Sequence, residues 1–268
     1  MPFHMIDMER YPRKAHFDYF RSLAYPAVGV TVDVDVTPLA EWSKKNGASF
    51  YLLFIHAAAL AADRVPELRQ RIRDGGIAEY QECPTSHTEA KPGGAYCYCT
   101  LRHHMPLAQY LERAEAARRQ CRESGSIQEE EDVESYYFVS TLPWLHYSAL
   151  IQPFAGGDDS NPRITWGKFE KNAAGRYIMP VTLLAHHALV DGIHIAAFYQ
   201  HLDQQIQAIA KEAISMSDPK KEQKELDWGD QIPEESDTPD PGDKTYRDGS
   251  AVNECWNEKS SNGLGVSD

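Results

Sequence analysis

The spacing of apolar and polar positions changes several times along the chain. Residues 28–36 alternate as a half-buried strand does, with a valine at every second position. Residues 48–65 form a long apolar run rich in alanine and leucine, which predicts a buried helix. Residues 106–123 place apolar side chains at helical spacing. Residues 175–190 carry no acidic or basic side chain after Arg176, as expected of a central strand.

Further segments complete the expected fold. Residues 76–83 and 95–101 are predicted to be strands, and the aromatic and β-branched stretch 135–153 predicts one or two more. Residues 193–214 show the spacing of an amphipathic helix. Pro180 argues for a strand end or bulge in its neighbourhood. The pattern predicts an α/β fold, a two-layer sandwich of helices on a mixed, largely antiparallel sheet.

Composition and charge separate a body from a tail. The chain has 268 residues, of which 42% are hydrophobic, enough for one sizeable core. We expect one domain over residues 1–215. Residues 216–268 hold 14 acidic and 6 basic side chains among many Pro, Gly and Ser, which predicts a disordered acidic tail. The net charge of -13 argues against nucleic acid as a partner.

Cysteine use and the N-terminus bear on location. The five cysteines form no CxxC pair, and Cys97 and Cys99, two apart on an expected strand, are predicted to pack on one side as small hydrophobic residues. Early charges stand where a signal peptide would have an apolar run, and no stretch approaches eighteen apolar residues. We therefore expect a soluble, cytoplasmic protein with no membrane partner.

The stretch HHALVDG, residues 186–192, carries the strongest chemical signal. It joins the expected central strand to the expected helix, and alternation places His186 and His187 on opposite faces, so that one can face a cleft while the other packs. One alternative is a metal site of His187, Asp191 and His194, but these residues lack a regular helical face, and we expect no metal. Another is a buried structural histidine, against which the aspartate in the same turn argues.

HHALVDG resembles the HHxxxDG signature of the chloramphenicol acetyltransferase family, which acyltransferase cores of 2-oxoacid dehydrogenase complexes and condensation domains share more loosely. Four other segments resemble the family in matching order: RYPRKAHFDYF (10–20), residues 49–72, YYFVSTLPWLHYSAL (136–150) and NPRITWGKF (161–169). The likeness spans roughly residues 3–211. It implies a CoA-dependent O-acetyltransferase that moves an acetyl group from acetyl-CoA directly to a hydroxyl of a small acceptor, with no acyl-enzyme.

The resemblance assigns roles to three catalytic residues. His187 would be the general base, for which histidine suits because its ordinary pKa of about 6.5 lies near working pH. Ser140 would donate its hydroxyl to the tetrahedral oxyanion. Thr165 would hold a water near the same intermediate.

Three further residues would support the site. By the resemblance Asp191 pairs with Arg13 in a buried ion pair that fixes the turn presenting the histidine, so Asp191 is not the third member of a catalytic triad. Gly192 is expected to allow the tight strand-to-helix turn.

The acceptor pocket is the least family-like part. Tyr19, Phe20 and Val28 fall where drug-acetylating members line it, and Tyr96 and Tyr98 are expected to add hydroxyls. Because Val28 and its neighbours are small for this role, chloramphenicol, and with it antibiotic resistance, is one hypothesis among several acceptors.

Assembly and the rival functions remain open at this point. The resemblance also implies a homotrimer with active sites between subunits. The alternatives are a non-catalytic relative that binds a metabolite, a metal-dependent protein, and an acyltransferase with another donor or acceptor. A further alternative is a lipoamide acyltransferase core, although we expect no upstream lipoyl module or linker.

Overall fold

The computed structural model describes residues 1–91, 95–124 and 132–216. The expected acidic tail therefore lies outside the described residues, apart from Met216. The elements are β1 (Phe3–Met5), α1 (Lys14–Arg21), β2 (Ala27–Asp35), α2 (Thr37–Asn46), α3 (Phe50–Asp63), β3 (Gln70–Arg73), β4 (Gly76–Tyr80), β5 (Thr85–Ala90), β6 (Tyr96–Leu101), α4 (Leu107–Ser124), β7 (Tyr137–Leu142), β8 (Arg163–Gly167), β9 (Glu170–Lys171), β10 (Tyr177–His186) and α5 (Gly192–Met216).

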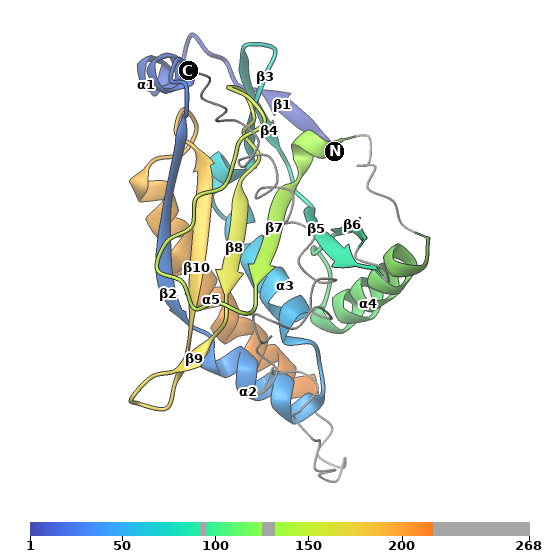
Figure 1. Ribbon diagram of the computed structural model, residues 1–268. Helices are drawn as coiled ribbons and strands as arrows, with labels where there is room; N and C mark the ends of the chain where they lie inside the picture. Colours follow the sequence, from blue (N-terminus) through green and yellow to red (C-terminus); the bar gives the residue numbers. More distant parts are fainter. Residues whose placement is uncertain (92–94, 125–131, 217–268) are drawn as a thin grey trace, which may run out of the picture.

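A seven-stranded mixed sheet forms the centre of the molecule (Figure 1). Its strand order is β2-β10-β8-β7-β5-β6, with β9 paired to β10. Strand β7 runs parallel to both β5 and β8, and the other pairs are antiparallel. A separate three-stranded sheet, β1-β4-β3, lies beside it. The prediction of helices on a mixed, largely antiparallel sheet is confirmed.

Helices α3 and α5 cover one face of the large sheet and enclose the core (Figure 1). Helix α3 begins where Ser49 accepts a hydrogen bond from the backbone of Leu52, as an N-cap serine does. Its side chains are buried all round, which explains why its sequence is apolar throughout. Val181, Leu183 and Ala185 of β10 are fully buried, so the charge-free strand is a central one as predicted.

The segment 143–162 covers part of the opposite face of the sheet (Figure 1). The prediction of strands over 135–153 is correct for β7 alone, because the chain leaves the sheet after Leu142 and folds back over it. Lys168 N donates to the Leu145 carbonyl at 2.7 Å, and a Cβ at Gly167 would collide with that same oxygen. Glycine at 167 therefore lets the covering segment approach the strand closely.

Pro180 lies inside β10 and not at its end. Towards β2 it stands opposite Asp33, whereas on the other side β8 pairs only from Val181 onward and β9 only up to Ile178. On this second side Pro180 therefore has no partner strand, which is a position where a missing N–H is tolerated.

The prediction that Cys97 packs as a plain hydrophobic residue is wrong. Cys97 of β6 forms a disulfide with Cys121 of α4, with their Cα atoms 6.2 Å apart. Cys99 is buried on the same side of the strand, as expected, and keeps its thiol. None of the helices α1 to α5 is long and apolar enough to cross a bilayer.

Candidate active site

The two histidines of HHALVDG end strand β10 and enter the turn before α5. His186, the last strand residue, is fully buried. Its Nδ1 accepts from the backbone of Ala188 at 3.1 Å, so its Nε2 carries the proton and donates to the Gly157 carbonyl at 2.7 Å. Burial lowers the pKa of His186. His186 is therefore a neutral packing residue that ties the turn to the covering segment.

His187 has the geometry of a base. Its Nδ1 lies 3.0 Å from the Val190 carbonyl, which can only accept, so Nδ1 carries the proton and Nε2 keeps its lone pair. The ring stacks on Phe20 of α1, with centroids 3.7 Å apart and planes 19° apart. One face of the imidazole is thus covered, its tautomer is set by the turn, and Nε2 is the atom that can take a proton.

Arg13 and Asp191 meet beside this turn, as the resemblance implies. Arg13 Nη2 lies 3.7 Å from Asp191 Oδ2, and Arg13 Nη1 donates to the Leu189 carbonyl at 2.5 Å. The expectation of a buried pair is wrong within one chain, because the Asp191 side chain is 50% exposed. The shorter contact shows that Arg13 holds the turn mainly through the Leu189 carbonyl.

Asp191 also bonds to the start of the following helix. Its Oδ1 accepts from the backbone N–H of Gly192, the first residue of α5, at 2.7 Å. That bond, followed by the charge of Arg13, lowers the pKa of Asp191. The expectation that Gly192 is needed for the turn is not supported: its φ is not left-handed, and a Cβ there would meet open space in this chain.

The structure does not bring His187, Asp191 and His194 together as a metal site. His194 Nδ1 accepts from the backbone of Asp191 at 2.9 Å, and its Nε2 lies 3.7 Å from Glu67. His187 Nδ1 is used by Val190. These side chains serve the turn and the start of α5.

Hydroxyl groups form a row across four neighbouring strands of the sheet. Ser140 of β7 stands opposite Thr165 of β8, Thr165 opposite Thr182 of β10, and Thr182 opposite Thr31 of β2. The hydroxyls of Thr31 and Thr182 are 2.7 Å apart. The two predicted residues Ser140 and Thr165 are thus direct neighbours.

Segment 143–162, which covers this face of the sheet, makes hydrogen bonds to the row of hydroxyls. The sequence did not predict these contacts. Tyr147 donates to the Thr165 carbonyl at 2.8 Å and accepts from the Thr182 hydroxyl at 3.1 Å. The Thr165 hydroxyl is buried and donates to Gln152 Oε1 at 3.1 Å, so its proton is already used and only its lone pairs could receive a water.

His187 and the hydroxyl row are far apart within one chain. Thr165 stands opposite Thr182, and His187 follows Thr182 by five positions along an extended segment. At about 3.3 Å per residue this separates them by about 17 Å along the strand direction. The base takes the proton of the attacking hydroxyl, and the oxyanion donor binds the carbonyl oxygen that this hydroxyl attacks, so both must lie within a few ångströms of the reacting carbonyl. A single chain therefore does not complete the predicted site.

The expected acceptor-binding residues fall into two groups. Tyr19 and Phe20 lie on α1 near His187, and Val28 pairs with Ala185 just before it. Tyr96 and Tyr98 lie on β6, the other edge of the sheet. One chain therefore does not bring the two tyrosines of β6 to the other three residues.

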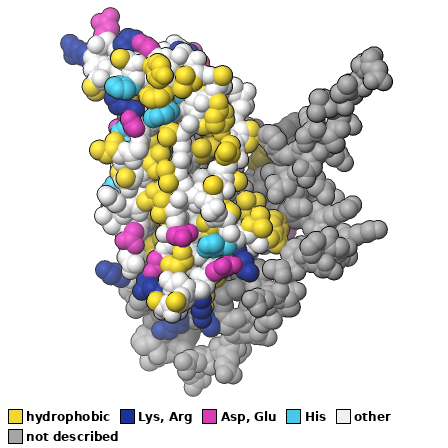
Figure 2. Space-filling view, turned by 60° about the vertical axis from the view of Figure 1, so that its left-hand side comes forward, with side chains coloured by type: hydrophobic (Ala, Val, Ile, Leu, Met, Phe, Trp, Pro, Cys, Tyr) yellow, Lys and Arg dark blue, Asp and Glu magenta, His cyan; other side chains and the backbone are white. Residues whose placement is uncertain are grey.

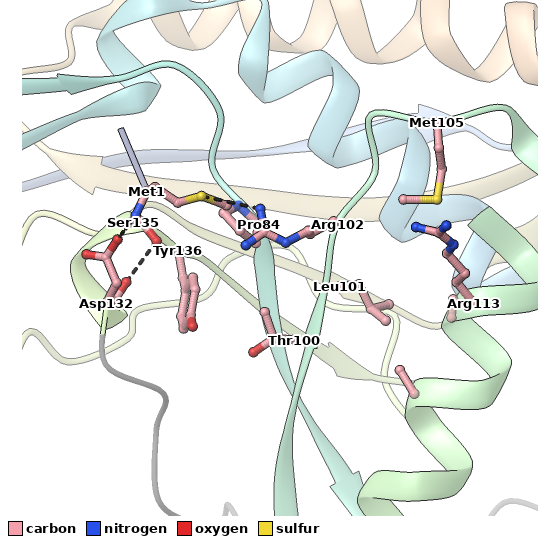
Figure 3. A pocket seen from close by; sticks show the side chains of 12 residues that line it. Met1, Pro84, Thr100, Leu101, Arg102, Met105, Arg113, Asp132, Ser135 and Tyr136 are labelled. Carbon is pink, nitrogen blue, oxygen red and sulfur yellow. Dashed lines mark hydrogen bonds and ion pairs between the residues drawn. The ribbon is translucent and has the colours of Figure 1, made fainter. Parts of the chain in front are cut away.

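The structure also contains a cavity of about 390 Å³, which lies away from these residues (Figure 3). It is lined by β6, α4 and the start of the chain, among others by Met1, Thr100, Arg113 and Tyr136. None of the expected site residues borders it. We place the candidate site at His187 because its chemistry is specific, whereas this cavity has no comparable arrangement.

A second group of titratable side chains escaped sequence reasoning. Asp63, His103 and His104 bring three possible ligand atoms within 4.8 Å of one another in the part of the chain that the structure describes. The adjacent histidines were visible in the sequence, but Asp63 lies 40 residues earlier and only the fold brings it to them.

Comparisons with known proteins agree with the fold and the motif. The family model described as chloramphenicol acetyltransferase matches residues 1–203. A chloramphenicol acetyltransferase from Proteus mirabilis is 25% identical over 202 residues, 75% of this chain and 93% of that protein, and one from Escherichia coli is 26% identical over 201 residues, 74% and 91%.

Solved structures show the same architecture. A chloramphenicol acetyltransferase superposes with a TM-score of 0.66 at 22% identity, covering 76% of this chain and all of that one. A dihydrolipoamide acetyltransferase from Azotobacter vinelandii gives 0.56 at 14%, covering 74% and 88%. The chain belongs to the chloramphenicol acetyltransferase family and is an acyltransferase.

Proposed function

We propose that this protein transfers an acetyl group from acetyl-CoA to a hydroxyl of a small acceptor, with His187 as general base. The observation that carries the proposal is the bond from His187 Nδ1 to the Val190 carbonyl, which leaves Nε2 as the proton acceptor. Family membership supports CoA-dependent O-acetylation, and the relatives are named for acetylating chloramphenicol.

The reaction balances with this one base. His187 Nε2 takes the hydroxyl proton as the acceptor oxygen attacks the thioester carbonyl carbon. The carbonyl oxygen then carries a negative charge, for which the Ser140 hydroxyl is the proposed donor. When the C–S bond breaks, the thiolate of CoA receives the proton back from His187, and the acetyl ester and CoA leave. No nucleophilic side chain is consumed.

The distance between His187 and Ser140 supports an active site between two chains. In a homotrimer, as the family resemblance implies, the His187 edge of one subunit would face the Ser140 and Thr165 row of the next. Hydrophobic side chains gather in a band on the side of the molecule where β2 lies (Figure 2). Exposed apolar residues of β2 and of the segments beside it are Tyr25, Val30, Leu145 and Ile151. Such a band is typical of a subunit interface.

The acceptor is proposed to bind next to Phe20, whose ring covers one face of His187. Tyr19 is 62% exposed and Val28 is partly buried, so α1 and the start of β2 offer an apolar surface of modest size. Chloramphenicol is one candidate for this surface, and with it a role in antibiotic resistance. The cytoplasm, where acetyl-CoA is available, is the proposed location.

An acceptor screen with a base variant tests the proposal. The purified protein is given acetyl-CoA and a panel of alcohols that includes chloramphenicol, and CoA release is followed with a thiol reagent. We expect release with at least one acceptor, and His187→Ala should abolish it while its elution volume on size exclusion is unchanged. His4→Gln, which removes an exposed histidine of β1, is the matched control.

Two results would contradict this account. Turnover retained by His187→Ala would remove His187 as the base. Binding of an alcohol or of acetyl-CoA by the wild-type protein without any CoA release would favour the alternative of a metabolite-binding relative.

A further inference from the structure

Asp63, His103 and His104 form a cluster where α3 ends and the segment from β6 to α4 passes. Both imidazole Nε2 atoms converge on one oxygen: Asp63 Oδ2 lies 2.7 Å from His103 and 2.6 Å from His104. Figure 3 shows Arg102 and Met105, the residues on either side of the two histidines in the sequence, at the cavity. The cluster joins residues 40 positions apart in the sequence.

The environment of Asp63 favours positive charge. Asp63 is the last residue of α3, so a carboxylate that is only 8% exposed sits at the negative end of a helix dipole. Three donors offset this charge: the two histidines on Oδ2 and the Tyr137 hydroxyl on Oδ1 at 2.7 Å. A cation at this point is stabilised by the carboxylate and by the helix end together.

The groups present suit a borderline divalent cation. Two imidazole nitrogens and one carboxylate oxygen are the ligand types that Zn²⁺ binds, at about 2.0–2.2 Å each. Tetrahedral coordination at such lengths needs ligand atoms about 3.3 Å apart, so the histidines must withdraw from Asp63 by about 0.6 Å. His104 is 46% exposed and can move, and its exposure leaves room for water as the fourth ligand.

Tyr137 matches the outer shell of such a site, whereas His103 lacks the usual outer partner. Tyr137 orients the carboxylate through the oxygen that the histidines do not use. His103 is 1% exposed and its Nδ1 has no hydrogen-bond partner, although this nitrogen is where a ligating histidine normally donates a proton. The Nδ1 atom of the nearby buried His56 also has no hydrogen-bond partner.

One cationic neighbour works against a metal. Arg69 Nε donates to the backbone carbonyl of Asp63 at 3.0 Å. Its guanidinium is also bound by the Tyr80 carbonyl and lies 3.6 Å from Glu79, which offsets part of its charge. Glu82 adds a further negative charge near His104.

We propose that His103 Nε2, His104 Nε2 and Asp63 Oδ2 bind one Zn²⁺ ion, which fastens the segment between β6 and α4 to the end of α3. The expectation of a protein without metal rested on the residues around His187 and on the absence of an obvious ligand cluster elsewhere in the sequence, and this cluster was not recognised there. The ion would hold this segment in place and would take no part in the acyl transfer proposed above, which needs no metal. The site therefore stands or falls independently of the proposed reaction.

Titration calorimetry with ZnCl₂ on the full chain, stripped with a chelator beforehand, tests the site. We expect one Zn²⁺ per chain, a rise in the midpoint of thermal unfolding on binding, and a visible tetrahedral absorption spectrum when Co²⁺ replaces Zn²⁺. His104→Gln removes a half-exposed ligand with little risk to folding and should weaken binding by about tenfold or more. Tyr137→Phe, which keeps the ring and loses the hydroxyl, should weaken it by about tenfold.

Two control variants each remove a possible zinc ligand that lies outside the proposed site. His16→Gln removes an exposed histidine of α1, and Cys255→Ser removes a thiol from the C-terminal segment. Both should bind Zn²⁺ as the wild type does. Absence of 1:1 binding at micromolar Zn²⁺, unchanged binding by His104→Gln, or loss of binding in either control would each overturn the proposal.

Discussion

The contact between Arg13 and Asp191 gives a quantitative test of how the turn before α5 is held. The ion pair spans 3.7 Å and Asp191 is half exposed, so its energy should be that of a surface pair, about 0.2–1 kcal/mol. The bond from Arg13 Nη1 to the Leu189 carbonyl is charge-assisted and should contribute about 1.5–3 kcal/mol. Asp191 in turn accepts from the first N–H of α5, which should contribute about 1 kcal/mol.

Three variants separate these contributions. Arg13→Ala should lower the free energy of unfolding by about 2–3 kcal/mol and Asp191→Ala by about 1–2 kcal/mol. The double variant should equal the sum of the two to within about 1 kcal/mol, because only the weak ion pair is shared. Urea unfolding at one fixed protein concentration measures all three, since assembly makes stability depend on concentration. Arg10→Ala, whose side chain is 89% exposed, is the control and should change little.

The coupling energy is the difference between the effect of the double variant and the sum of the two single effects. A coupling energy of about 3 kcal/mol or more would refute this reasoning. Such a value belongs to a fully buried pair, and it would mean that a neighbouring chain covers Asp191 in the assembled protein. The same turn positions His187, so Arg13→Ala should also reduce the rate of CoA release, whereas Arg10→Ala should not.

Three other substitutions give direct tests. Ser140→Ala should lower kcat by about 10²–10³ in the CoA-release assay while urea unfolding is unchanged, and an unchanged kcat would remove Ser140 as the oxyanion donor. Gly192→Ala should leave the free energy of unfolding within about 1 kcal/mol, because a Cβ there meets open space, and a larger loss would point to a neighbouring chain at this position. Burial raises the pKa of Glu89, but hydrogen bonds from His87 and Arg118 outweigh burial and lower this pKa to about 2, from the ordinary 4.5. The ionised Glu89 therefore stabilises the fold above about pH 4.5, and this contribution is lost as the pH falls through 2. Glu89→Gln should remove on the order of 2–3 kcal/mol of that pH dependence, and an acid unfolding curve with the same slope as the wild type would contradict the assignment.

The spacing of apolar and polar residues was sufficient to predict the helices and strands whose burial follows from their own composition. The all-apolar α3 is buried, the alternating valines form strand β2, although Val30 is 47% exposed, and the charge-free β10 lies inside the sheet. The short-range motif was equally informative. The contact that sets His187 Nδ1 against Val190 lies within four residues, whereas the role of His187 as a base was predicted from the family resemblance.

Tertiary structure alone decided the features that join distant segments. The disulfide between Cys97 and Cys121, the segment 143–162 over the hydroxyl row, and the cluster of Asp63 with His103 each depend on where the chain returns. Two positions follow from strand order and not from local pattern: Asp191 is half exposed, and Tyr96 and Tyr98 lie at the far edge of the sheet from α1. Periodicity reports which face of an element is apolar, but not which other element will cover it, since that choice depends on the packing of the whole chain.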